Sequence, residues 1–93
     1  MAIFAIIHQP GKSADQLLTA LVNGYGENKV MGVADGTWLL AASGTAQEVS
    51  QHVGITEGQA GSAMVLEVAS YFGRANPSIW SWMKTNWEDS AGG

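Results

Sequence analysis

Apolar residues follow two different spacings along the 93-residue chain, and the spacing predicts which segments are strands and which are helices. Residues 2–8, AIFAIIH, form an unbroken apolar run, which is typical of a strand buried on both faces at the centre of a sheet. Residues 14–25 instead repeat apolar side chains at helical spacing. The segment Ser13-Ala14-Asp15-Gln16 matches a capping box, in which serine and glutamine side chains satisfy free backbone N–H groups, and Gly24 is the expected end of this helix.

Residues 28–43 predict a hairpin. Asp35-Gly36 suits a two-residue turn, because glycine adopts a positive φ without steric cost. The register set by this turn pairs apolar residues on both faces: Val33 with Trp38 and Met31 with Leu40 on one, Val30 with Ala41 and Gly32 with Leu39 on the other. Since both faces are apolar, we expect both to be covered.

The second half of the chain repeats this alternation of elements. Thr45-Ala46-Gln47-Glu48 is another capping box and opens a short helix that Gly54 ends. Residues 57–61, EGQAG, are expected to be a flexible link that buries nothing. Residues 62–70 form the last predicted strand, and the final helix starts at Asn76-Pro77, because proline is tolerated in a first helical turn. Three apolar side chains share one side of that strand: Met64, Leu66 and Val68.

The predicted order is βαββαβ with one more helix. It indicates an α+β fold, specifically a ferredoxin-like βαββαβ sandwich with an additional C-terminal helix. Right-handed crossovers place the first and third strands centrally and both capped helices on one face. Residues 1–88 then form a single ferredoxin-like domain, and residues 89–93 form a flexible tail. The other face of the sheet is apolar and open, so it needs cover from a second chain, from the terminal helix, or from both.

The terminal helix, within NPSIWSWMKTNWE, holds three of the four tryptophans. At about 100° per residue, one continuous apolar stripe runs along it. The stripe consists of Ile79, Trp80, Met83 and Trp87, and we expect it to cover an apolar surface of the same chain. Trp82 falls well off the stripe. It suggests contact with a second chain, packing within the monomer, or a platform on which a base or ligand stacks.

Charge and composition limit the partners. Only 13% of the residues are charged, which suggests that another chain covers part of the surface. The formal net charge is −4 and the four basic residues are scattered, so nucleic-acid binding is not expected without a partner, whereas a basic protein would be attracted. The chain has no cysteine, no basic start of a signal peptide and no apolar run of membrane-spanning length, which favours a cytoplasmic protein.

Few residues are candidates for catalysis. His8 stands at the end of the first strand, where it could act as a base or metal ligand, but no second histidine or carboxylate accompanies it at ligand spacing. A hydrogen-bonded structural histidine is therefore the preferred interpretation. Glu67 lies in an otherwise apolar strand, and we expect it to point to solvent or to pair with a basic residue. No serine has a nearby histidine, and no metal site or cofactor is predicted.

The stretch DGTWLLAASGTAQEV, residues 35–49, resembles the middle of small ferredoxin-like antitoxin and CRISPR-associated proteins. More specifically, it resembles GhoS-type and SinR-like proteins, relatives of the small CRISPR-associated endonuclease fold. The likeness runs from the first to the fourth strand and consists of the topology together with Thr37-Trp38, Thr45 and Glu48. It implies a dimer that meets through its sheets. In nuclease members an aspartate ends the first strand and helps to hold a divalent metal, whereas His8 stands there here, so the resemblance implies binding rather than cutting.

These observations predict a non-catalytic, homodimeric protein-interaction module, for which an antitoxin or a phage or mobile-element inhibitor of a defence enzyme would be a fitting role. The expected interface residues are Trp82, Trp38, Met31 and Leu40. One alternative is a metal-dependent endoribonuclease or nuclease of the same fold, with His8 as base or ligand. Another is a ferredoxin-like dimer that binds a small ligand between its sheet and helices.

Overall fold

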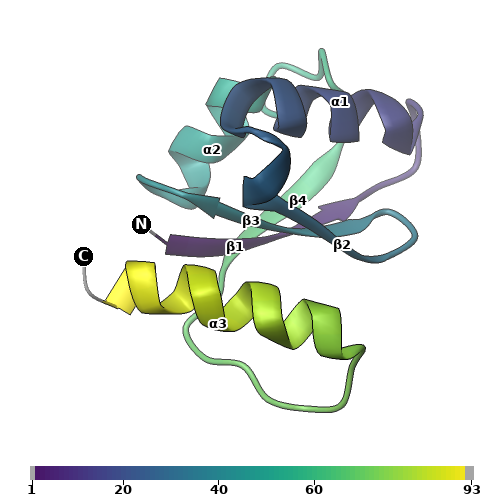
Figure 1. Ribbon diagram of the computed structural model, residues 1–93. Helices are drawn as coiled ribbons and strands as arrows, with labels where there is room; N and C mark the ends of the chain where they lie inside the picture. The colour runs from purple at the N-terminus through teal and green to yellow at the C-terminus, as the bar shows by residue number, and fades with distance from the viewer. Residues whose placement is uncertain (1, 92–93) are drawn as a thin grey trace.

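The computed structural model describes residues 2–91, which form one four-stranded antiparallel sheet and three α-helices (Figure 1). In chain order, the elements are β1 (Ala2–His8), α1 (Ala14–Tyr25), a 3-10 turn (Glu27–Lys29), β2 (Val30–Ala34), β3 (Thr37–Ala42), α2 (Ala46–Val53), β4 (Ala63–Glu67) and α3 (Pro77–Ala91). The strand order across the sheet is β2-β3-β1-β4. The predicted α+β class, the βαββαβ order with a terminal helix, and the central places of β1 and β3 are therefore confirmed.

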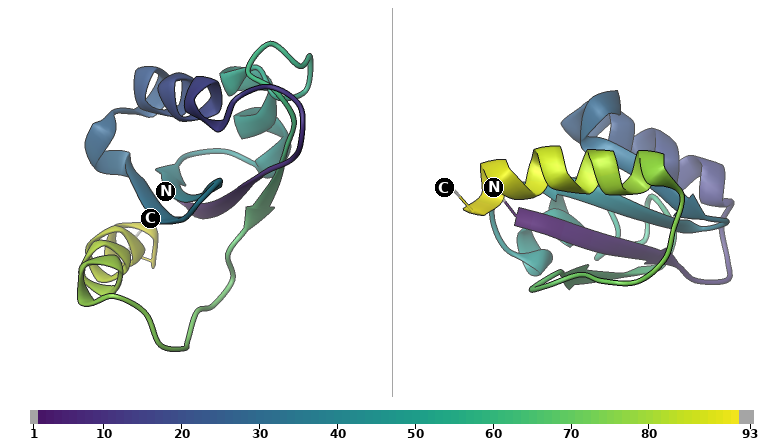
Figure 2. Two further views of the ribbon diagram at one scale, coloured as in Figure 1. Left: turned by 90° about the vertical axis from the view of Figure 1, so that its right-hand side faces the viewer. Right: turned by 60° about the horizontal axis from the view of Figure 1, so that its bottom comes forward.

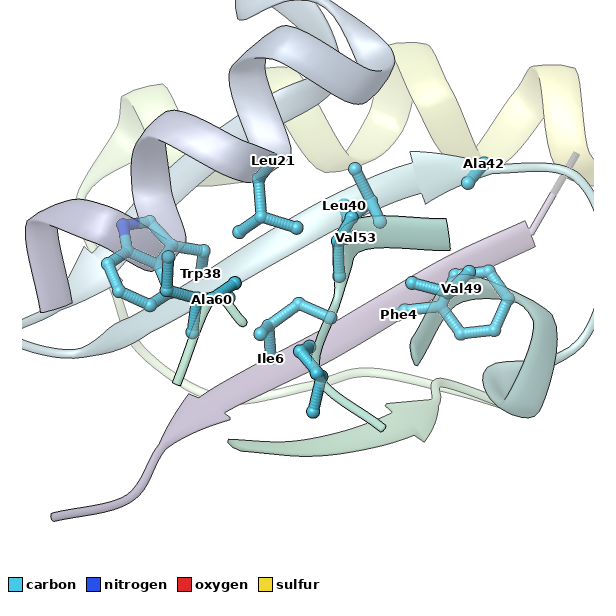
Figure 3. Packing of buried hydrophobic residues seen from close by; sticks show 11 residues of the cluster. Phe4, Ile6, Leu21, Trp38, Leu40, Ala42, Val49, Val53 and Ala60 are labelled. Atoms are coloured by element: carbon cyan, nitrogen blue, oxygen red, sulfur yellow. The ribbon is translucent and has the colours of Figure 1, made fainter. Parts of the chain in front are cut away.

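The sheet lies between two helical layers. Helices α1 and α2 cover one face, and α3 runs across the other face (Figures 1 and 2). The main core forms between the sheet and the first layer (Figure 3). Its fully buried members are Phe4, Ile6, Leu17, Leu21, Leu40 and Val49. Ile3 points to the opposite face and is buried there with Met83 of α3, which explains the unbroken apolar run of β1.

The predicted capping box is present at α2, whereas the cap of α1 differs from the prediction. At α2 both capping-box bonds form: the Glu48 N–H donates to the Thr45 hydroxyl at 3.1 Å, and the Thr45 N–H donates to the Glu48 carboxylate at 3.0 Å. At α1 the Ser13 hydroxyl accepts from the Asp15 N–H at 3.1 Å, one residue earlier than a capping box requires. This helix also ends at Gly26 rather than Gly24, and the Gly26 N–H donates to the Val22 carbonyl at 2.9 Å.

The predicted register of the hairpin is correct at its turn and wrong beyond it. Ala34 pairs with Thr37 across Asp35-Gly36, as expected, but a β-bulge between Gly32 and Ala34 shifts the rest of β2 by one residue. Further along, the pairs are Gly32 with Trp38, Met31 with Leu39, and Val30 with Leu40. A one-residue slip exchanges the faces of a strand. As a result, Met31 does not share a face with Leu40.

Residues 57–61 contribute to the main core, so the prediction that this segment buries nothing is wrong. Ala60 is buried in the main core, as is Ile55 shortly before it. Gly54 caps α2 in the left-handed conformation and turns the chain back, and the Ala60 N–H donates to the Gly54 carbonyl at 3.0 Å. Two isolated apolar residues have no periodicity, so the sequence pattern did not reveal this packed turn.

The ends of two other elements differ from expectation. Strand β4 covers Ala63–Glu67 only, because the chain beyond Val68 leaves the sheet to reach α3. Helix α3 continues to Ala91, so three residues of the predicted 89–93 tail belong to its backbone. The final two residues of that predicted tail lie outside the described residues. Within residues 2–91, no helix combines the length and the apolar character that crossing a bilayer requires.

We expect Thr45→Ala to lower the free energy of unfolding by about 1 kcal/mol, because the first turn of α2 loses its side-chain cap. Urea denaturation at a fixed protein concentration measures this change. Gln47→Ala is the matched control, since Gln47 is exposed in the same turn and makes no capping bond. Equal stabilities of the two variants would show that the cap does not contribute.

A candidate interaction surface

Helix α3 packs on the face of the sheet opposite α1 and α2 and forms a second, smaller core there. The buried centre of this core is Ile3, Ala41 and Met83. Around them pack the half-buried Leu39, Val68, Ile79, Trp82 and Trp87. The apolar open face predicted from the sequence is therefore covered in part by the chain's own terminal helix.

The predicted apolar stripe included Trp80 and left Trp82 outside, whereas in the structure Trp82 and not Trp80 packs around the second core. Trp82 packs against the second core, and its indole N–H donates to the Asn28 carbonyl at 3.0 Å. Trp80 lies at the rim, where its ring stacks on Tyr71 with 5.8 Å between the ring centroids. Of the three alternatives for Trp82, packing within the monomer is the one that the structure describes.

Asn86 explains why α3 is rotated relative to the prediction. It is the one buried polar residue among those that the structure describes, with 4% of its surface exposed. Its amide donates to the Trp82 carbonyl at 2.9 Å and its Oδ1 accepts from the Lys29 ammonium at 3.5 Å. At about 100° per residue Asn86 lies between Trp82 and Met83 around the helix, so burying its amide draws the inward face of the helix toward Trp82. A rule that assigns only apolar residues to the buried face misses Asn86, although it follows Trp82 by one helical turn.

The hairpin residues expected at an interface lie at different depths. Trp38 and Leu40 are buried in the main core, where they present no surface to a partner, and their predicted interface role is therefore wrong for the folded chain. The pairing of β3 with β1 is the reason, because Leu40 lies beside Phe4 and Trp38 beside Ile6, on the face that α1 and α2 cover. Met31 is half-buried and pairs with Leu39, on the α3 side of the sheet.

The exposed apolar residues gather on β4 and on the loop that follows it. Met64 and Leu66 are 51% and 42% exposed, and Tyr71 and Phe72 are 37% and 103% exposed. We call these four residues the β4 strip. Helix α3 packs on β1 and β2 instead, and in the left view of Figure 2 it lies to one side of β4. The sheet therefore extends beyond the area that α3 covers.

A hollow of about 320 Å³ adjoins the end of the β4 strip. It is lined by Tyr71, Phe72, Gly73, Trp80 and Lys84. Tyr71 also contacts Trp87 edge to face, with the ring centroids 5.0 Å apart. Aromatic rings of this kind supply large contact areas at protein interfaces, and Phe72 itself contributes nothing to the chain's own core.

His8 has a structural contact at the end of β1. Its Nε2 lies 2.7 Å from the Lys12 carbonyl oxygen, and because a carbonyl only accepts, Nε2 carries the proton and donates. The His8 backbone N–H donates to the Gly36 carbonyl at 2.7 Å, which ties the end of β1 to the hairpin turn. The hydrogen bond expected of a structural histidine is therefore present, and its structural role stays a prediction.

Three further titratable side chains, Tyr25, Glu48 and His52, line one hollow. Tyr25 and His52 meet edge to face at 5.1 Å beside a polar hollow of about 500 Å³ that Glu48 also lines. Burial, together with the negative charge of Glu48, raises the pKa of Tyr25, so this phenol stays protonated and is not a base. Glu67 is exposed at the end of the edge strand β4, as expected. In the described part of the chain, no three His, Asp or Glu side chains gather as metal ligands would.

Comparison of the chain with protein-family models, with curated proteins and with solved structures found no match.

We expect Trp82→Phe to lower the free energy of unfolding by about 1 kcal/mol more than Trp80→Phe, because only Trp82 loses a hydrogen bond to a backbone carbonyl. Both variants lose the same atoms, so the difference between them reports the bond to Asn28 together with the deeper packing of Trp82. Chemical denaturation followed by circular dichroism measures it. A larger loss in Trp80→Phe would mean that Trp82 does not anchor α3.

Proposed function

We propose that the protein is a non-catalytic interaction module that acts as a homodimer, and that the β4 strip is its main contact. The observation that carries this proposal is the concentration of the exposed large apolar side chains on one strand and the loop after it. Soluble monomers rarely expose apolar residues together in this way. Burying one Phe, Leu or Met side chain contributes about 1.5–3 kcal/mol, so the strip supplies enough free energy for association.

A second copy is the simplest occupant of this surface. In a two-fold symmetric contact each residue is used twice, so the free energy that a small strip contributes is doubled. The low charge fraction of the chain agrees with a surface that is covered in part. The net charge of −4 remains on the outside of such a dimer, where it would favour a basic protein as a further partner.

The non-catalytic part of the proposal is supported by His8 and its surroundings. The proton on Nε2 is engaged with a carbonyl, and the described residues do not gather three metal ligands at the imidazole. A nuclease that uses a divalent cation needs several oxygen or nitrogen ligands around it. The nuclease alternative therefore gains no support from the geometry.

The residues that carry the family resemblance serve the fold. Trp38 is buried in the main core, and Thr45 and Glu48 form the capping box of α2. We propose the ferredoxin-like class for the domain, supported by the strand order β2-β3-β1-β4, the antiparallel pairing and the two helices on one face. An experimental structure in which β4 did not pair with β1 would contradict that class. The antitoxin or inhibitor role stays a prediction, since these structural residues say nothing of a partner.

The chain is expected to sediment at micromolar concentration with twice the mass of one chain. Leu66→Lys should convert it to a monomer, because a charge placed in the apolar contact is desolvated on association. Thr19→Lys adds the same charge on the exposed face of α1 and should leave the dimer intact. A wild-type monomer, or a Leu66→Lys dimer of unchanged affinity, would contradict the proposal.

Purified protein is expected to leave RNA and DNA intact in the presence of Mg²⁺ or Mn²⁺. The assay compares the wild type with His8→Ala on single-stranded and double-stranded substrates. Cleavage by the wild type that is lost in His8→Ala would favour the nuclease alternative. Cleavage that persists unchanged in the variant would indicate a contaminant.

A further inference from the structure

Strand β4 has one free edge, and the hydrogen bonds of its other edge determine which backbone groups point outward. The Gln9 N–H donates to the Ser62 carbonyl and the Val68 N–H donates to the Ile3 carbonyl, both at 2.8 Å. In an antiparallel pair, residues alternate between facing the partner strand and facing away from it. Positions 62, 64, 66 and 68 therefore direct their backbone groups toward β1. Ala63, Val65 and Glu67 direct theirs toward the free edge.

The central strand gives an independent check of this alternation. The His8 N–H donates to the Gly36 carbonyl on the β3 side. Even-numbered positions of β1 thus bond to β3 and odd-numbered positions, such as Ile3 and Gln9, bond to β4. The backbone N–H and C=O groups of Ala63, Val65 and Glu67 lie at the edge of the sheet that β4 forms.

Three of the usual protective devices, lysine, proline and a bulge, are missing from the edge strand β4. Natural edge strands carry lysine, proline or a bulge that prevents pairing with another chain. The sequence of β4, AMVLE, has no lysine and no proline, and its register with β1 is continuous. Its one charge, Glu67, stands at the end of the strand.

We infer that β4 pairs with β4 of a second copy, antiparallel and centred on Val65, so that the two sheets join into one. This inference rests on the proposed homodimer and specifies its contact. The outward backbone groups then meet in register: Val65 faces Val65 of the partner subunit, and Ala63 faces Glu67 of the partner subunit. Each such pair exchanges two N–H···O bonds.

The side chains favour this register over those centred on Glu67 or Ala63. Met64 lies opposite Leu66 of the partner subunit in a non-hydrogen-bonded pair, where Cα atoms are about 4.5 Å apart and side chains contact closely. Both residues are exposed in the single chain and would cover one another. Centring the pair on Glu67 would instead place two like charges opposite each other, which is destabilising. Centring it on Ala63 would leave Leu66 without an apolar neighbour on the second strand.

The first test removes the central hydrogen bonds. Val65→Pro lacks the outward N–H but costs no bond to β1, so the single chain is expected to fold, as proline is tolerated at such edge positions. We expect the variant to sediment as a monomer with the circular dichroism of the wild type. Val65→Thr keeps the N–H and the branched side chain, and it should remain a dimer.

The second test reads the register and does not depend on the proline variant folding. The chain has no cysteine, so Met64→Cys and Leu66→Cys each introduce a single thiol. In the inferred pairing, residue 64 meets residue 66 of the partner within disulfide range, whereas two copies of residue 64 lie diagonally, beyond about 7 Å. An equimolar mixture of the two variants should form disulfide-linked dimers at least about tenfold faster than either variant alone.

The outcomes separate this inference from the homodimer itself. A wild-type chain that stays monomeric overturns both. A dimer that persists in a folded Val65→Pro overturns the strand pairing while the homodimer stands. Faster linkage within one cysteine variant than in the mixture overturns the register centred on Val65. Monomeric Val65→Pro together with preferential linkage between residues 64 and 66 supports the pairing.

Discussion

The burial of both faces of the central strands is the constraint on which the rest of the structure depends. Strand β1 is apolar on both sides, with Phe4 and Ile6 toward α1 and α2 and Ile3 toward α3. A sheet of this kind cannot leave either face in water without losing most of the free energy that burial contributes. Two helices fulfil this requirement on one side, and the terminal helix has to fulfil it on the other.

Both apolar and polar contacts hold helix α3 against the sheet. Met83 supplies the buried apolar centre, while Asn86 and Trp82 bond to each other and to the turn before β2. Polar contacts of this kind have one geometry each, whereas apolar packing tolerates several rotations of a helix. The side-chain amide therefore selects the rotation, and the tryptophan that the helix turns outward is Trp80 rather than Trp82.

The sheet is wider than helix α3, so part of its apolar surface stays exposed. One helix spans β2, β3 and β1, and β4 with its following loop extends beyond it. Met64, Leu66 and Phe72 remain exposed for this reason, beside an edge whose backbone groups are free to pair. This surface is the basis of the proposed interaction module. The edge strand explains how two copies could share it.

The sequence by itself determined the elements, their order, the Thr45 cap and the need for cover on both faces, because these depend on local spacing and on the amount of apolar surface. Only the tertiary structure decided the bulge in β2, the burial of Ala60 and the inward turn of Trp82. Each of these depends on contacts between segments distant in the chain, as when Asn28 and Lys29 meet α3. The expected interface residues Trp38 and Leu40 became core residues for the same reason, because the pairing of β3 with β1 puts them on the face of Phe4 and Ile6. In β2, a one-residue shift in pairing exchanges the faces of the strand, and no local pattern records that shift.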